Sequence, residues 1–242
     1  IPAVLQDLNE AGYGNCRICI RSDQENVIKS IKRNIIENRK AETVPQESPV
    51  KESKCNGKME QAVQALEGQL RTYSCDVEAE TGVKPHPRSR LYGFMLRWAC
   101  TVLTRYRLTS CGKSPFEILT GHKCSRPLAP FATPILWKKT LKDSERNKGE
   151  SDWSTGMFLG VKWRTSEAIV ATEDDVIMCR TMRLDCEMKT ATEQMLNNIP
   201  KTVIEVLYSK NEPDEQSEPD TPEEEDRDEP TVAKMFGEFD DE

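Results

Sequence analysis

Apolar residues recur at helical spacing in the first 40 residues, on either side of a short stretch that alternates. Residues 4–8 have Val4, Leu5 and Leu8 on one face and precede two glycines, a pattern that predicts a short helix. Residues 16–21 alternate apolar-capable and basic side chains, which predicts a strand. A second helix is predicted next, with an apolar face made of Val27, Ile28, Ile31 and Ile35. Residues 43–49, which include two prolines, predict a loop.

Three further helices are predicted between residues 57 and 121. Residues 57–72 carry an apolar stripe at helical spacing, formed by Met59, Ala62, Val63, Leu66 and Leu70. Residues 91–106 have an expected buried face of Leu91, Phe94, Met95, Trp98, Ala99 and Val102, and an expected basic surface of Arg97, Arg105 and Arg107. Residues 114–121 form a short helix in which Ser114 and Glu117 make a capping box and Gly121 marks the stop.

The period of the hydrophobic pattern changes after residue 134. Residues 158–163, 168–172 and 176–180 predict three short strands, joined by turns at 164–167 and 173–175. A meander of this kind is large enough for a small barrel-like module. Beyond residue 210 the chain has few apolar residues, several prolines and many charges, so we expect that tail to be disordered.

Charge is distributed unevenly along the 242 residues. The formal net charge is −7, but residues 211–242 contain 15 acidic and two basic side chains, which leaves +6 for residues 1–210. A basic body gives weak support to a nucleic-acid partner. For the acidic tail a solubilising role, a protein-interaction role and a nucleic-acid-mimicking role all stay open.

Several protein classes do not fit the composition. No stretch approaches the roughly 20 apolar residues of a membrane span. The first seven residues lack the features of a signal peptide, and the absence of an initial Met suggests a fragment or a processed piece. The nine cysteines are interpreted as reduced thiols.

Two carboxylates have positions that suit metal-assisted chemistry. Asp23 follows the first predicted strand, and Glu60 lies near the start of a predicted helix, with 36 residues between them. Carboxylates at strand ends and helix starts can converge on Mg²⁺, which prefers oxygen ligands. Two such ions can activate an attacking hydroxyl and stabilise a leaving oxygen in phosphodiester chemistry. A pair of unrelated surface residues is the competing interpretation.

The surroundings of this pair resemble a known family. Residues 20–25 read Ile-Arg-Ser-Asp-Gln-Glu, and residues 56–60 read Asn-Gly-Lys-Met-Glu. Residues 114–121 read Ser-Pro-Phe-Glu-Ile-Leu-Thr-Gly, and residues 153–160 fit Trp-x-x-Gly-x-Phe-Leu-Gly. In this order the segments are similar to the integrase region of the Pol polyprotein of copia-type LTR retrotransposons. The resemblance covers about residues 1–184.

The resemblance implies an α/β protein with three parts. Residues 1–127 would be an RNase H-like integrase core that lacks its first strands, 128–190 a small all-β barrel-like module, and 191–242 a linker with a disordered acidic tail. The family joins DNA with two ions, Mg²⁺ or Mn²⁺, held by two Asp and one Glu. Asp23 would be the second ligand and Glu60 the third. The leading Asp has no counterpart, since Asp7 lies on a predicted helix, so we expect this polynucleotidyl transferase to be inactive as a fragment.

The resemblance also implies residues that contact nucleic acid. The candidate nucleic-acid-binding residues are Asn56, Gly57, Lys58, Arg97, Lys138 and Lys139. Asn56 could instead cap its helix, and each single cation could belong to a solvated face. The side chains of Trp137, Trp153 and Trp163 could either stack on bases or fill the core. Gln64 and Glu67 stand where retroviral relatives carry DNA-gripping lysines.

The expected partner is DNA, both the element ends and the target, and the expected location is the nucleus. No membrane association is expected. A homo-oligomer and a protein partner of the tail stay open. The alternative functions are a non-catalytic DNA- or chromatin-binding protein derived from an integrase and an interaction protein that works through its tail.

Overall fold

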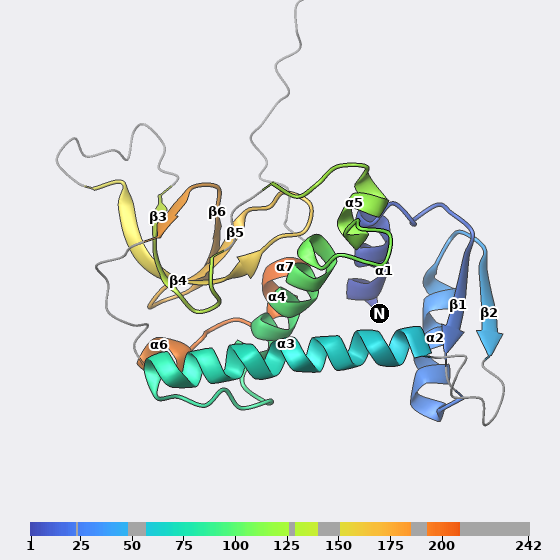
Figure 1. The fold of residues 1–242 in the computed structure, drawn as a ribbon, viewed down its shortest axis with the longest axis horizontal. Coiled ribbons are helices and arrows are strands. Elements are labelled where there is room, and N and C mark those ends of the chain that lie inside the picture. The colour runs from blue at the N-terminus through green and yellow to red at the C-terminus, as the bar shows by residue number, and fades with distance from the viewer. Residues whose placement is uncertain (23, 48–56, 126–128, 140–150, 185–192, 209–242) are drawn as a thin grey trace, which may run out of the picture. The chain divides into compact units, whose positions relative to one another are not determined.

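A computed structural model describes residues 1–22, 24–47, 57–125, 129–139, 151–184 and 193–208. All of them belong to the compact unit 1–209 (Figure 1). The helices are α1 (Pro2–Glu10), α2 (Asn26–Asn38), α3 (Gly57–Thr81), α4 (Arg90–Tyr106), α5 (Pro115–Thr120), α6 (Glu193–Asn197) and α7 (Val203–Tyr208). The strands are β1 (Ile18–Ser22), β2 (Thr43–Glu47), β3 (Pro134–Lys138), β4 (Trp153–Val161), β5 (Ala168–Ala171), β6 (Val176–Cys179) and β7 (Met182–Leu184). Among the described helices, none has the length and apolar character that a membrane span requires.

The N-terminal part contains a parallel β1–α2–β2 unit. The two strands pair from Ile18 opposite Thr43 to Ser22 opposite Glu47, and α2 makes the crossover. The predicted strand and both predicted helices of this region are confirmed. The predicted loop over 43–49 is wrong for residues 43–47, which form β2. Pro45 argued against a strand, but each strand of a two-stranded sheet has a free edge, where proline is tolerated.

Helix α3 extends beyond its predicted end at residue 72 and reaches Thr81. Its C-terminal half packs against α4 and buries Leu70 and Val77. Its N-terminal half leaves Met59 63% and Val63 45% exposed. The apolar stripe predicted for this helix is therefore covered along only part of its length by the described residues.

The predicted strands belong to a five-stranded antiparallel sheet with the order β6-β5-β4-β3-β7. The structure adds β3 and β7, which the sequence pattern did not indicate. The two edge strands β6 and β7 are separated along the chain by residues 180 and 181 alone, so the sheet must curl strongly. The register of β4 with β5 shifts between Phe158 and Gly160. Gly160 has a φ of 135°, a backbone angle that residues other than glycine rarely adopt.

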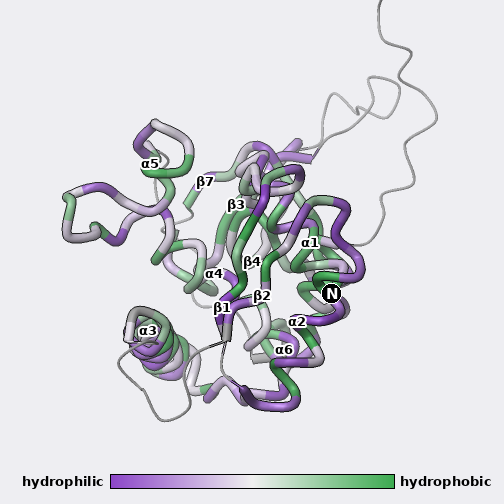
Figure 2. Tube along the Cα trace, turned by 90° about the vertical axis from the view of Figure 1, so that its right-hand side faces the viewer, coloured by the Kyte–Doolittle hydropathy of each residue, from purple (hydrophilic) through white to green (hydrophobic). Residues whose placement is uncertain are grey.

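Helix α4 joins this sheet in one hydrophobic core. Phe94 and Met95 are fully enclosed, and the ring of Trp98 meets that of Phe158 edge-on with centroids 5.1 Å apart. The predicted buried face of α4 is thus confirmed at these residues, and Figure 2 shows hydrophobic residues along β4 and α4. The expectation that Arg105 lies on the basic surface is wrong, because its side chain is 4% exposed.

The C-terminal helices α6 and α7 fall in the stretch 191–208 that was predicted to be a linker. Leu196 and Leu207 join the core that α3, α4 and the sheet form. This core continues across residue 127, and the domain boundaries at 127/128 and 190/191 stay predictions. The described chain is a mixed α/β protein with one antiparallel five-stranded sheet and a separate parallel pair of strands.

Candidate functional site

The first candidate site is the pair of carboxylates at the ends of β1 and α3. Asp23 follows Ser22, the last residue of β1, and itself lies outside the described residues. Parallel pairing of β1 and β2 brings Ser22 and Glu47 to the same edge of the two-stranded sheet. Glu60 lies in the first turn of α3. The pairing therefore places Ser22, which precedes Asp23, at the same edge as Glu47, whereas Glu60 follows in α3 after residues that the structure does not describe.

Glu60 is exposed to solvent, so its carboxylate is accessible to a cation. The positive end of the helix dipole stabilises its negative charge. Within the described ranges, the structure contains no group of three or more His, Cys, Asp or Glu side chains that could hold a metal ion. Gly57 begins α3, whereas Asn56 and the side chain of Lys58 are outside the described part of the chain.

Asp7 belongs to a different arrangement, which connects three helices. Nη1 and Nη2 of Arg97 on α4 each donate to one Asp7 carboxylate oxygen at 3.0 Å. The hydroxyl of Tyr208 on α7 lies 2.9 and 3.0 Å from the same two oxygens. These hydrogen bonds connect α1 to α4 and α7, so the Asp7 carboxylate has a structural role in holding the three helices together.

The Asp7 network changes the acid–base properties of its members. Burial lowers the pKa of Arg97, but the hydrogen bond to Asp7 raises it, and the charges of Tyr208, Asp7 and Cys100 raise it further, so the pKa lies above its usual value. Burial raises the pKa of Tyr208, the charge of Arg97 lowers it, and the hydrogen bond and charge of Asp7 raise it again, so this pKa also lies above its usual value. The predicted contact of Arg97 with nucleic acid would require this ion pair to open, and it stays a prediction.

The second candidate site is a cationic face on β3, β4 and β7. Lys138 is exposed at the end of β3, opposite Trp153 in the register with β4. The guanidinium of Arg183 on β7 lies 4.3 Å from the centroid of the Trp153 ring. Lys139 follows Lys138, and its backbone N–H donates to the carbonyl of Asp152 at 2.8 Å. This arrangement puts cations beside an aromatic ring, a combination that can contact phosphates and bases.

Sequence reasoning found Lys138 and Lys139 but missed Arg183. The three-residue strand β7 gave no recognisable alternation, so nothing in the sequence placed Arg183 beside Trp153. The other two tryptophans are engaged elsewhere. Trp137 packs against the core while its Nε1 donates to the carbonyl of Thr155, and Trp163 meets the ring of Phe116 with centroids 5.5 Å apart.

Comparisons with protein-family models, with curated proteins and with solved structures found no match to this chain.

Proposed function

We propose that this chain is derived from a retrotransposon integrase and that it handles DNA. The observation that carries the proposal is the order of elements, in which β1, α2, a parallel β2 and then α3 follow one another. In that order Asp23 follows β1, and Glu60 lies in the first turn of α3. This order of elements fits the one expected between the second and third carboxylates of an RNase H-like integrase core. The curled five-stranded sheet fits the small β module expected after that core.

In this proposal Asp23 and Glu60 bind Mg²⁺ or Mn²⁺. A 3′-hydroxyl would attack a target phosphate in the intact enzyme, with the ions stabilising the charge that develops. Asp23 and Glu60 are two of the three carboxylates of that set, so we expect residues 1–242 to bind a cation without supporting strand transfer. The nucleus is the proposed place of action.

Metal binding and strand transfer test this proposal separately. Mn²⁺ binding to the full chain, measured by electron paramagnetic resonance, should weaken at least tenfold in Asp23→Asn and in Glu60→Gln. Glu67→Gln, a change of the same kind two turns further along α3, should leave Mn²⁺ binding unchanged. If Asp23→Asn and Glu60→Gln bind Mn²⁺ as tightly as Glu67→Gln does, the metal site is refuted. Strand transfer that depends on Asp23 would refute the proposed inactivity.

A second candidate function, non-catalytic DNA binding, is favoured by the cationic face of Lys138, Arg183 and Trp153. The logarithm of the binding constant falls linearly with the logarithm of the salt concentration, with a slope of about −0.9 for each phosphate neutralised on duplex DNA. Lys138 and Arg183 would therefore give a slope of about −2.

Fluorescence anisotropy with labelled duplex DNA measures that slope for the full chain. Arg183→Gln should make the slope shallower by about 1, whereas Arg88→Gln, which removes a charge from an exposed turn, should not change it. A slope that falls equally in both variants would show that the face does not contact DNA.

A further inference from the structure

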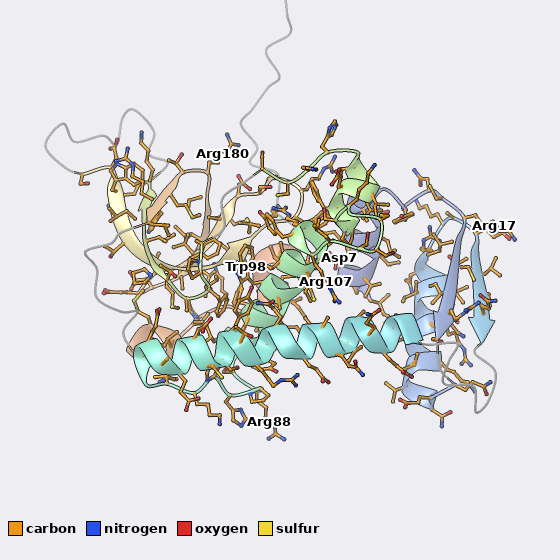
Figure 3. The ribbon with its side chains drawn as sticks, viewed as in Figure 1. Asp7, Arg17, Arg88, Trp98, Arg107 and Arg180 are labelled. Carbon is orange, nitrogen blue, oxygen red and sulfur yellow. The ribbon has the colours of Figure 1, made fainter. Side chains whose placement is uncertain are left out.

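A half-open cavity of about 230 Å³ lies between α4 and the curled sheet. Figure 3 labels two of its lining residues, Trp98 on α4 and Arg180 in the bend after β6. The cavity is lined by Trp98, Arg105, Tyr106, Val161, Ser166, Ala168, Arg180, Thr181 and Met182. Its wall therefore combines two arginines and several hydroxyl groups with an apolar surface.

Arg105 is an unusual residue to find in this wall, because its side chain is almost fully buried. Its Nη2 donates to the carbonyl of Trp163 at 2.7 Å, and its guanidinium lies 5.3 Å and 5.5 Å from the ring centroids of Trp163 and Phe116. Its Nε has no hydrogen-bond partner, and no described carboxylate pairs with it. A buried cation without a counter-anion is costly, so a bound anion would stabilise this site.

Arg180 also lines the cavity and supplies a second cation. Its side chain is 90% exposed, and its Nε lies 3.4 Å from Oε1 of Glu167, which is a long and solvent-screened contact. The side chain can therefore turn toward a ligand at little cost. Thr181 lines the cavity next to it and offers a hydroxyl group.

We propose that this cavity binds the phosphate group of a small phosphate monoester. Guanidinium groups match the geometry of phosphate oxygens with paired N–H donors. A monoester at neutral pH carries about −1.5 to −2 charges, which balances Arg105 and an Arg180 that has turned away from Glu167 better than a monocarboxylate does. The apolar wall of Trp98, Val161 and Met182 would contact the organic part of the ligand. This inference is independent of the proposed cation site and of the cationic face.

Nuclear magnetic resonance titration of the full chain with inorganic phosphate, uridine monophosphate and acetate tests the proposal. We expect saturable shifts of the backbone amides of residues 161, 166, 168 and 180–182, with the monophosphate binding more tightly than acetate. Arg180→Gln should weaken monophosphate binding about tenfold. Arg88→Gln, which removes the same charge at an exposed turn away from the cavity, should not.

Three outcomes would overturn the proposal. The first is the absence of saturable shifts at these amides up to about 10 mM ligand, a concentration well above the dissociation constant of a specific phosphate site. The second is an equal effect of Arg88→Gln and Arg180→Gln, which would indicate attraction by net charge. The third is acetate binding as tightly as the monophosphate. Arg180 is 90% exposed, so Arg180→Gln tests the proposal without a substitution at the buried Arg105, which would disturb the fold.

Discussion

The three-helix network around Asp7 allows a quantitative test of how the N-terminal helix is held. The side chains of Arg97 and Asp7 are 24% and 39% exposed, so the pair is neither fully buried nor fully solvated. Hydrogen bonds to charged groups contribute about 1.5–3 kcal/mol, while exposed ion pairs contribute about 0.2–1 kcal/mol. Asp7→Asn removes the charge and faces Arg97 with an amide donor, so we expect a loss of about 2 kcal/mol in the free energy of unfolding.

Urea denaturation followed by tryptophan fluorescence measures this loss. With a slope of about 2 kcal/mol/M, the midpoint should fall by about 1 M in Asp7→Asn. Tyr208→Phe should cost about 1 kcal/mol, and the double variant should cost less than the sum because both changes remove contacts to the same carboxylate. Glu67→Gln breaks an exposed pair with Arg71 and should cost less than about 0.5 kcal/mol. An effect of Asp7→Asn no larger than that of Glu67→Gln, or strict additivity with Tyr208→Phe, would refute the reasoning.

Three further predictions concern other parts of the fold. Burial, with a smaller effect of Glu167, raises the pKa of Cys179 from 9.0 to about 11, so the folded state keeps a proton that the unfolded state loses. Stability should therefore fall between pH 9 and 11, by up to about 3 kcal/mol, and the fall in urea midpoint should be shallower in Cys179→Ala. Gly160→Ala should cost about 1–3 kcal/mol, because φ is 135° and the new Cβ would lie 3.4 Å from Cε3 of Trp98; an unchanged melting temperature would contradict this. Ser114→Ala should cost about 1 kcal/mol by removing the buried hydroxyl that accepts from the N–H of Glu117, and an unchanged urea midpoint would contradict this.

Local pattern was sufficient to predict the elements whose burial follows their own periodicity. The spacing of Phe94, Met95 and Trp98 predicted the buried face of α4, and Ser114 and Gly121 predicted both ends of α5. Arg105 follows Trp98 by seven positions, which is two helical turns, so the same spacing placed it on the buried face. Its charged side chain argued for the surface, but the ring of Phe116 on the next helix and that of Trp163, 58 positions further along the chain, accommodate it.

Features that depend on distant partners could not be predicted from the sequence. Strand β2 owes its structure to pairing with β1, which outweighs the effect of Pro45. The contact between Asp7 and Arg97 joins residues 90 positions apart, and the contact with Tyr208 joins residues 201 positions apart. No periodicity spans such separations, so Asp7 was recognised as a helix residue but not as the centre of a network.

The structure also changes what the net charge of the body means for nucleic-acid binding. Residues 1–210 carry +6, but several of the arginines are engaged inside the fold. Arg97 is paired with Asp7, Arg105 is buried, and Nη1 of Arg90 donates to the carbonyls of Ile199 and Pro200 at 2.9 and 2.7 Å. The number of cations that can release counterions is therefore smaller than the count of basic residues suggests. Any DNA binding by the described part of the chain should depend on a few exposed cations such as Lys138 and Arg183, and single substitutions there should have effects large enough to measure.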